Sequence, residues 1–211
     1  MDHDADIPEQ PPMGRGDCAS KPFDIVALAS SAGGLTALST VLGALPGEFP
    51  VAIVIVQHLD PRHRSVMADI LSRRTPLKVK QAEAGESLFP ATVYIAPPDR
   101  HLLVNSDGTL SLTQSELVHF VRPSADLLFE SVAASYRDRA IAVILSGSGS
   151  DGAMGAQAIK KMGGTVIAQD EATAEFPGMP SDVIKTRSVD FILPLAEIAP
   201  ALASLVLRVE R

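Results

Sequence analysis

The chain has 211 residues, 46% of them hydrophobic, and 18 Lys and Arg against 25 Asp and Glu give a net charge of −7. This length predicts one sizeable domain, and the acidic balance argues against a nucleic-acid-binding protein, whose binding face is basic. The only cysteine, Cys18, excludes an internal disulfide and fits a reducing compartment such as the cytoplasm. No apolar run approaches the roughly 20 residues of a membrane span, and the acidic N-terminus lacks the apolar segment of a signal peptide.

Residues 1–22 are rich in Pro, Gly and Asp without periodicity, which predicts a disordered tail ahead of one domain at 23–211. From there, apolar runs alternate with amphipathic segments. This pattern predicts an α/β fold with a doubly wound, mostly parallel sheet, helices on both faces and a small antiparallel excursion near 91–113. The predicted strands are 25–29, 51–56, 78–81, 91–96, 101–104, 140–145, 165–168 and 189–193, and the predicted helices are 35–42, 65–73, 124–136, 153–162 and 196–207.

Three of the predicted strands are followed by polar side chains that a turn does not require: Ser31, His58 and, after a glycine-rich stretch, Asp151. Because parallel strands end at one edge of a sheet, where ligands bind, these side chains can meet there. A hydroxyl, an imidazole and a carboxylate together are the groups needed for acyl transfer. We therefore interpret Ser31 as a nucleophile, His58 as its base and Asp151 as the orienting acid. The order Ser, His, Asp and the absence of Gly-x-Ser-x-Gly differ from the familiar serine hydrolases.

Each of these residues also has a structural interpretation. Ser31 can cap the helix that starts near residue 35, and Asp151 can cap the helix after Gly152. His58 can hydrogen-bond a backbone carbonyl at the end of its strand. His101 and His119, which fall beside short strands, are interpreted as structural or surface residues.

Two ligand-binding alternatives receive less support from the sequence. A metal site built from His58, Asp60 and His63 is disfavoured because Pro61 breaks the spacing and no second ligand cluster accompanies it. The glycine-rich stretch 146–149 can cradle a phosphate, but it lacks the Lys of a P-loop and the spacing of a dinucleotide site. We therefore predict neither a metal nor a cofactor.

Six segments, in the family's order, resemble the catalytic domain of the chemotaxis protein-glutamate methylesterases (CheB type), and the resemblance spans about 23–207. It implies hydrolysis of γ-glutamyl methyl esters on the cytoplasmic helices of chemoreceptors, with release of methanol and often with deamidation of receptor glutamines. It also implies the triad Ser31, His58 and Asp151, and an oxyanion hole of backbone amides from His58 and Ser148. The segments are 29–34 (ASSAGG), 56–58 (VQH), 93–101 (VYIAPPDRH), 122–126 (RPSAD), 144–153 (ILSGSGSDGA) and 167–180 (IAQDEATAEFPGMP).

The chain departs from the family pattern in three places. Ala32 stands where Thr is frequent and Ser148 where Met is frequent, although either residue keeps its backbone amide. Regulated family members carry a receiver domain in front, and about 22 residues are too few for a domain. We therefore expect a free-standing esterase domain, monomeric and cytoplasmic, controlled if at all by a separate response-regulator partner. A catalytically silent signalling scaffold is the alternative. The segment 176–180 is expected to be a loop at the cleft, with Met179 as an apolar contact for the substrate.

Overall fold

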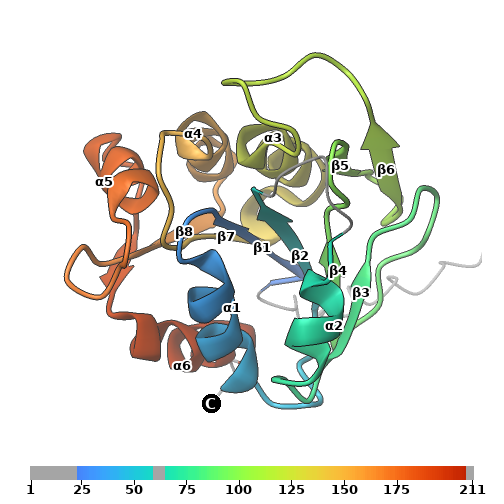
Figure 1. Ribbon diagram of the computed structural model, residues 1–211, viewed down its shortest axis with the longest axis horizontal. Coiled ribbons are helices and arrows are strands. Elements are labelled where there is room, and N and C mark those ends of the chain that lie inside the picture. The colour runs from blue at the N-terminus through green and yellow to red at the C-terminus, as the bar shows by residue number, and fades with distance from the viewer. Residues whose placement is uncertain (1–22, 59–64, 208–211) are drawn as a thin grey trace, which may run out of the picture.

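A computed structural model describes residues 23–58 and 65–207, so the predicted tail and the residues Asp60 and His63 lie outside the described residues. Seven parallel strands form one sheet in the order β3-β4-β2-β1-β7-β8-β9, and two antiparallel strands, β5 and β6, form a hairpin (Figure 1). The strands are β1 (Ile25–Ser30), β2 (Ala52–Gln57), β3 (Lys78–Gln81), β4 (Thr92–Ile95), β5 (His101–Val104), β6 (Leu110–Thr113), β7 (Ala140–Ile144), β8 (Thr165–Gln169) and β9 (Phe191–Leu193).

Helices cover both faces of the sheet, with α3 and α4 on one side and α1 and α6 on the other (Figure 1). Within β1, Ile25, Ala27 and Ala29 pack into one hydrophobic cluster and Val26 and Leu28 into the other. A strand buried on both faces explains the unbroken apolar run of the sequence. The helices are α1 (Gly34–Gly43), α2 (Met67–Ser72), α3 (Ala125–Tyr136), α4 (Ala153–Lys161), α5 (Gly178–Lys185) and α6 (Leu195–Val206), with a short 3₁₀ turn, η1 (Arg137–Arg139), after α3.

The strand order creates a switch point beside β1. The chain runs from β1 to β2, crosses to the edge strand β3 and comes back to β4 on one side, and then passes to β7 on the other side. In open parallel sheets, the crevice at such a reversal, outside the carboxyl ends of the strands, is where ligands bind. The residues that follow β1, β2 and β7 therefore share this crevice.

The predicted fold is confirmed, with two local corrections. Residues 91–96 belong to the parallel sheet as β4, so the antiparallel excursion is confined to β5 and β6. The segment 178–185, part of which was expected to be a loop, forms α5, because Pro180 lies in the first turn, where a missing amide is tolerated. Ser124 caps α3 as predicted, since its Oγ accepts from Leu127 N at 3.4 Å. Within the described ranges, no helix is long and apolar enough to cross a membrane.

Candidate active site

Ser31 begins the turn that joins β1 to α1. Its amide donates to the carbonyl of Ser146, just beyond β7, at 3.0 Å, and its carbonyl accepts from Gly34 N at 2.9 Å. The N-cap of α1 is Gly33, with φ 71 and no side-chain cap, so the interpretation of Ser31 as a helix cap is wrong. Within the part of the chain that the structure describes, the Ser31 hydroxyl forms no hydrogen bond, which leaves it available for chemistry.

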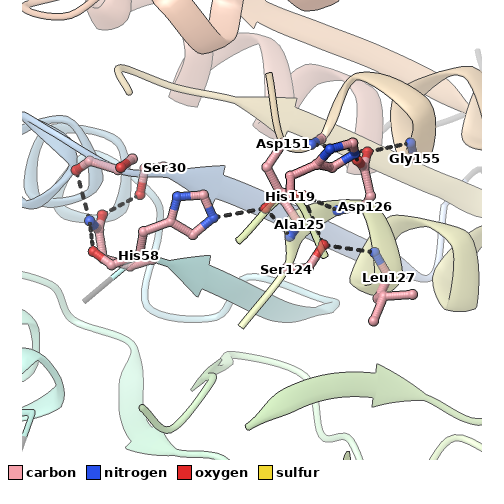
Figure 2. Close-up of polar contacts among 12 residues, drawn as sticks. Ser30, His58, His119, Ser124, Ala125, Asp126, Leu127, Asp151 and Gly155 are labelled. Carbon is pink, nitrogen blue, oxygen red and sulfur yellow. Dashed lines mark hydrogen bonds and ion pairs between the residues drawn. The ribbon is translucent and has the colours of Figure 1, made fainter. Parts of the chain in front are cut away.

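His58 follows β2, and its ring points toward Asp151 (Figure 2). His58 Nε2 lies 2.8 Å from Asp151 Oδ2, and the His58 side chain is 13% exposed. An ionised carboxylate can only accept hydrogen bonds, so Nε2 carries the proton of a neutral His58 and Nδ1 keeps a lone pair. The ring is therefore oriented by a carboxylate, and the alternative in which His58 caps a backbone carbonyl is wrong.

Asp151 is held by His58 and by three donors at the N-terminus of α3. Its Oδ2 accepts from Ala125 N at 2.6 Å as well as from His58, and its Oδ1 accepts from Ser124 Oγ at 2.8 Å and from Asp126 N at 3.1 Å. Burial alone raises the pKa of Asp151, but these hydrogen bonds, with that from His58 the strongest, bring the pKa below the usual Asp value. Asp151 is thus a satisfied, buried carboxylate.

Asp151 and Asp126 stabilise each other's helices. The N-cap of α4 is Gly152, without a side-chain cap, so Asp151 does not cap α4 as the structural interpretation required. Instead, Asp126 Oδ1 accepts from Gly152 N at 3.0 Å and Gly155 N at 2.7 Å, while Asp151 accepts from the first amides of α3. Negative charge at a helix N-terminus is favourable. Because each carboxylate accepts from the first amides of the other helix, the pair holds the N-termini of α3 and α4 together.

Asp126 carries a second oxygen that is less well satisfied. Its Oδ2 is buried without a hydrogen-bond partner among the described residues, and His119 Nε2 lies 3.4 Å away. Burial is the main cause that raises the pKa of Asp126, and the nearby charge of Asp151 adds to it. The two neighbouring carboxylates therefore have pKa values shifted in opposite directions.

His101 supports Asp151 from behind. It is fully buried, its Nδ1 accepts from Ser124 N at 3.1 Å, and its Nε2 donates to the carbonyl of Glu116 at 3.0 Å. These bonds fix Ser124, whose hydroxyl in turn holds Asp151. His101 is thus structural, as interpreted from the sequence. Its link to Asp151 through Ser124 could not be predicted from the spacing of these residues along the chain.

Gln57, the last residue of β2, is a buried polar residue whose role the sequence did not reveal. Its Nε2 donates to the carbonyls of Ser31 at 2.7 Å and His58 at 3.0 Å, and its Oε1 accepts from Ser30 Oγ at 2.6 Å. The only sequence signal was an amide side chain at the end of a strand that is otherwise apolar and buried. One side chain therefore ties the turn of Ser31 to that of His58.

The two predicted oxyanion donors differ in their hydrogen bonds. The amide of His58 already donates to the carbonyl of Ser30 at 3.1 Å, because the pairing of β1 with β2 continues past Gln57. An amide that is engaged in the sheet is disfavoured as a donor to an oxyanion. The amide of Ser148 donates to no acceptor within residues 23–58 and 65–207. The preceding Gly147 packs against Ser31, since a Cβ on Gly147 would lie 3.0 Å from Ser31 Cβ.

The segment beyond Gly147 corrects one expectation about the cleft. Met179 is fully buried and would collide with a Cβ on Gly147, so it packs behind the site and offers no contact to a substrate. Phe176, three residues earlier, is 42% exposed. No group of three or more metal-ligating side chains lies close together in the described part of the chain.

Comparisons with known proteins agree with this architecture. A Leptospira interrogans protein named for protein-glutamate methylesterase and protein-glutamine glutaminase is 43% identical over 177 residues, covering 84% of this chain and 92% of that protein. A Moorella thermoacetica protein of the same name is 42% identical, but the match covers 87% of this chain and only 44% of that protein. The crystal structure of the Thermotoga maritima CheB methylesterase catalytic domain superposes with a TM-score of 0.84 at 41% identity, covering 87% of this chain and 99% of that one. The profile of the family described as CheB methylesterase matches residues 26–202, and the chain belongs to that family.

Proposed function

We propose that this protein is a protein-glutamate methylesterase that hydrolyses glutamate γ-methyl esters on chemoreceptors. Family membership and the names of its relatives support the reaction. The observation in this chain that carries the proposal is the hydrogen bond of 2.8 Å between His58 and Asp151 at the switch point of the sheet. Ser31 follows β1 at the same switch point, and its hydroxyl forms no hydrogen bond with another described residue. We assign Ser31 as the nucleophile, His58 as the base and Asp151 as the orienting carboxylate.

In the first half of the reaction, Ser31 Oγ attacks the ester carbonyl carbon, and His58 Nδ1 accepts the hydroxyl proton. Asp151 holds the ring in its tautomer and stabilises the imidazolium that forms. When the tetrahedral intermediate collapses, the bond to the methoxy oxygen breaks, and that oxygen takes the proton from His58. Methanol leaves, and a glutamyl ester of Ser31 remains. This triad uses the ring nitrogens in the opposite sense to chymotrypsin, in which Nδ1 faces the carboxylate.

In the second half, water attacks the glutamyl ester and gives its proton to His58. The bond to Ser31 Oγ then breaks, the serine regains a proton, and a glutamate side chain is released. A glutamine side chain would form the same acyl-enzyme with ammonia as the leaving group. The names of the relatives include protein-glutamine glutaminase, which supports this second activity on receptor glutamines.

The negative charge of the tetrahedral intermediates needs backbone donors. We assign the Ser148 amide to this role, and in place of His58 we add the amide of Ala32, which follows the nucleophile and also has no acceptor among the described residues. In other serine hydrolases the residue after the nucleophile supplies such a donor. Losing one oxyanion donor costs roughly 100- to 1000-fold in kcat, so both amides have a measurable share in turnover.

The proposed substrate sets the location and the partners. Methylated helices in the cytoplasmic part of a chemoreceptor place the enzyme in the cytoplasm, where we propose that it acts as a monomer. A separate response regulator is the proposed source of control. A silent scaffold with the same fold is the alternative, and the satisfied His58–Asp151 pair favours the enzyme.

The test is methanol release from a methylated cytoplasmic fragment of a receptor. The unsubstituted protein is expected to release methanol and Ser31→Ala to release none, while both have the same melting temperature. A Ser31→Ala protein that restores chemotactic adaptation in cells lacking the enzyme would favour the scaffold. Turnover of a small ester without any release from the receptor fragment would keep the triad and reject the receptor as substrate.

A further inference from the structure

A turn near the site exposes an aromatic side chain. Val118 and Val121 exchange two backbone hydrogen bonds of 3.2 and 2.9 Å, and the residues between them, His119 and Phe120, have φ 48 and 65. Two-residue turns with two positive φ angles favour Asn and Gly, because other side chains are strained there. The local backbone therefore gives no reason for an aromatic residue at position 120.

Core packing does not explain Phe120 either. It is 94% exposed, the most exposed large apolar side chain of the described residues. A buried Phe stabilises a fold by removing its ring from water, and Phe120 contributes nothing of this kind to the protein alone. Backbone strain gathers at active sites and ligand-binding sites, so the strained turn that exposes Phe120 points to contact with another molecule.

The segment that carries Phe120 is fixed on both sides of the turn. His101 Nε2 donates to the carbonyl of Glu116 at 3.0 Å. The guanidinium of Arg122 donates to the carbonyl of Ser115 at 2.7 Å and to the Asp99 carboxylate at 2.6 Å. A backbone segment that is already held in place loses less entropy on binding than a mobile one.

The turn also lies beside Asp126, the residue that donates to the proposed catalytic carboxylate. His119 Nε2 is 3.4 Å from Asp126 Oδ2, and Asp126 N donates to Asp151 Oδ1 at 3.1 Å (Figure 2). Phe120 therefore directly follows His119, whose side chain approaches Asp126, and Asp126 in turn bonds Asp151.

Two further exposed apolar side chains, Met154 and Phe176, belong to segments whose backbone forms hydrogen bonds with residues around the proposed site. Met154, 59% exposed, lies between Gly152 and Gly155, whose amides donate to Asp126. The carbonyl of Phe176 accepts a hydrogen bond from Gly147 N at 2.8 Å, and its amide donates to Ser146 Oγ at 3.0 Å. We call Phe120, Met154 and Phe176 the apolar rim.

We propose that the apolar rim, of which Phe120 is the most exposed member, docks apolar side chains of the substrate polypeptide that flank the methylated glutamate. This inference rests on the proposed function, because it takes the receptor helix as the occupant. A glutamyl ester on an amphipathic helix brings neighbouring apolar side chains with it, whereas a small ester brings none. The rim therefore selects protein esters over small ones and acts on binding more than on the chemical step.

The test uses Phe120→Asn, since Asn tolerates positive φ and is expected to keep or raise the melting temperature. For this variant, kcat/KM on the methylated receptor fragment is expected to fall about tenfold, as for an aromatic contact at an interface, mainly through KM. The ratio of kcat/KM on receptor to that on a small ester should fall with it. The matched control is Phe89→Asn. Phe89 is 62% exposed and precedes β4, at the end of the sheet opposite to the carboxyl ends of the strands. Its substitution should leave the ratio unchanged.

The possible outcomes separate this inference from the proposed function. Suppose that the unsubstituted protein releases methanol. An unchanged kcat/KM in Phe120→Asn, or an equal loss on both esters, would then overturn this inference and leave the proposed function intact. No release from the receptor by the unsubstituted protein overturns both. A direct measurement uses Ser31→Ala protein, which cannot turn over. Its Kd for the methylated fragment should weaken about tenfold when Phe120→Asn is added, as at other aromatic hot spots. An unchanged Kd, or a Phe120-dependent dimer in sedimentation, would contradict the inference.

Discussion

The side-chain amide of Gln57 donates a hydrogen bond of 2.7 Å to the carbonyl oxygen of Ser31. The same nitrogen also donates to the carbonyl of His58 at 3.0 Å, so one buried side chain sets the separation of the proposed nucleophile from its base. A rigid link of this kind matters because displacing a reacting group by about 1 Å can lower the rate by roughly 100-fold.

The substitution Gln57→Glu tests this link. Glu keeps the size and the acceptor for Ser30 Oγ, but its second oxygen faces two carbonyl oxygens in place of the donating nitrogen. We expect kcat for methanol release to fall roughly 100-fold with little change in KM, because positioning is lost while binding is retained. The control is Gln169→Glu. Gln169 is equally buried but bonds Ser146 N and Thr173 instead, and its substitution should affect kcat less. A rise in KM at constant kcat would instead place Gln57 in substrate binding.

Gly34→Ala is expected to disturb the same link from the opposite side. A Cβ on Gly34 would overlap Gln57 Oε1 and lie 2.8 Å from Ser30 Cβ, both in the packed core, so Gln57 must move. Overpacking of this kind typically costs about 1–3 kcal/mol, and we expect kcat to fall together with the melting temperature. In Gly47→Ala, the new Cβ would make ordinary contact with Pro76 at 3.4 Å, and activity should persist. Full activity in Gly34→Ala would mean that Gln57 need not stay where it is.

The sequence predicted the sheet well because its strands are buried on both faces and read as unbroken apolar runs such as 25–29 and 140–145. It also predicted that His58 and Asp151 can meet, since parallel strands deliver their ends to one edge, and their hydrogen bond agrees with this. The roles of Ser31, His58 and Asp151 stay a prediction. The sequence did not predict α5, where Pro177, Gly178 and Pro180 suggested a loop. The supporting contacts of Gln57, His101 and Asp126 were also missed, because each bonds a residue distant in the chain and no local spacing encodes such a contact.

Ser124→Ala tests the support of the proposed catalytic carboxylate. The change removes the donor that lies 2.8 Å from Asp151 Oδ1, and we expect kcat to fall about tenfold, equivalent to ~1.4 kcal/mol of transition-state free energy. The hydrogen bond from Ser124 is one of the causes that lower the pKa of Asp151, so its loss raises that pKa. The acid limb of the pH–activity profile should therefore move to higher pH, because the Asp151 carboxylate is protonated more readily.

Two further variants separate this role from the role of Ser124 as a helix cap. Ser124→Thr keeps the hydroxyl and should restore both kcat and the position of the acid limb. Ser131→Ala, in the same helix, removes a hydroxyl that bonds Leu128 O and Val104 N, so it should lower the melting temperature without moving the acid limb. An acid limb that stays in place in Ser124→Ala would mean that Ser124 acts only as a cap.

Asp126→Asn and Asp151→Asn are expected to change stability in opposite directions as pH rises. Burial raises the pKa of Asp126, so the folded state binds this proton more tightly than the unfolded state, and stability falls as pH rises from about 4 through the folded pKa. The amide in Asp126→Asn still accepts from Gly152 N and Gly155 N and carries no charge, so the variant should gain stability relative to the unsubstituted protein with increasing pH.

The pKa of Asp151 is lowered instead, so its contribution is present above about pH 4 and is lost as pH falls through the folded pKa. Asp151→Asn should therefore be less stable at neutral pH, by about 1–3 kcal/mol for a buried donor left without its acceptor, and this deficit should shrink on acidification. Thermal melts of both variants between pH 3 and 8 give the comparison. Parallel changes in the two variants would contradict the opposite pKa shifts of these two carboxylates, because burial dominates for Asp126 whereas hydrogen bonds outweigh burial for Asp151.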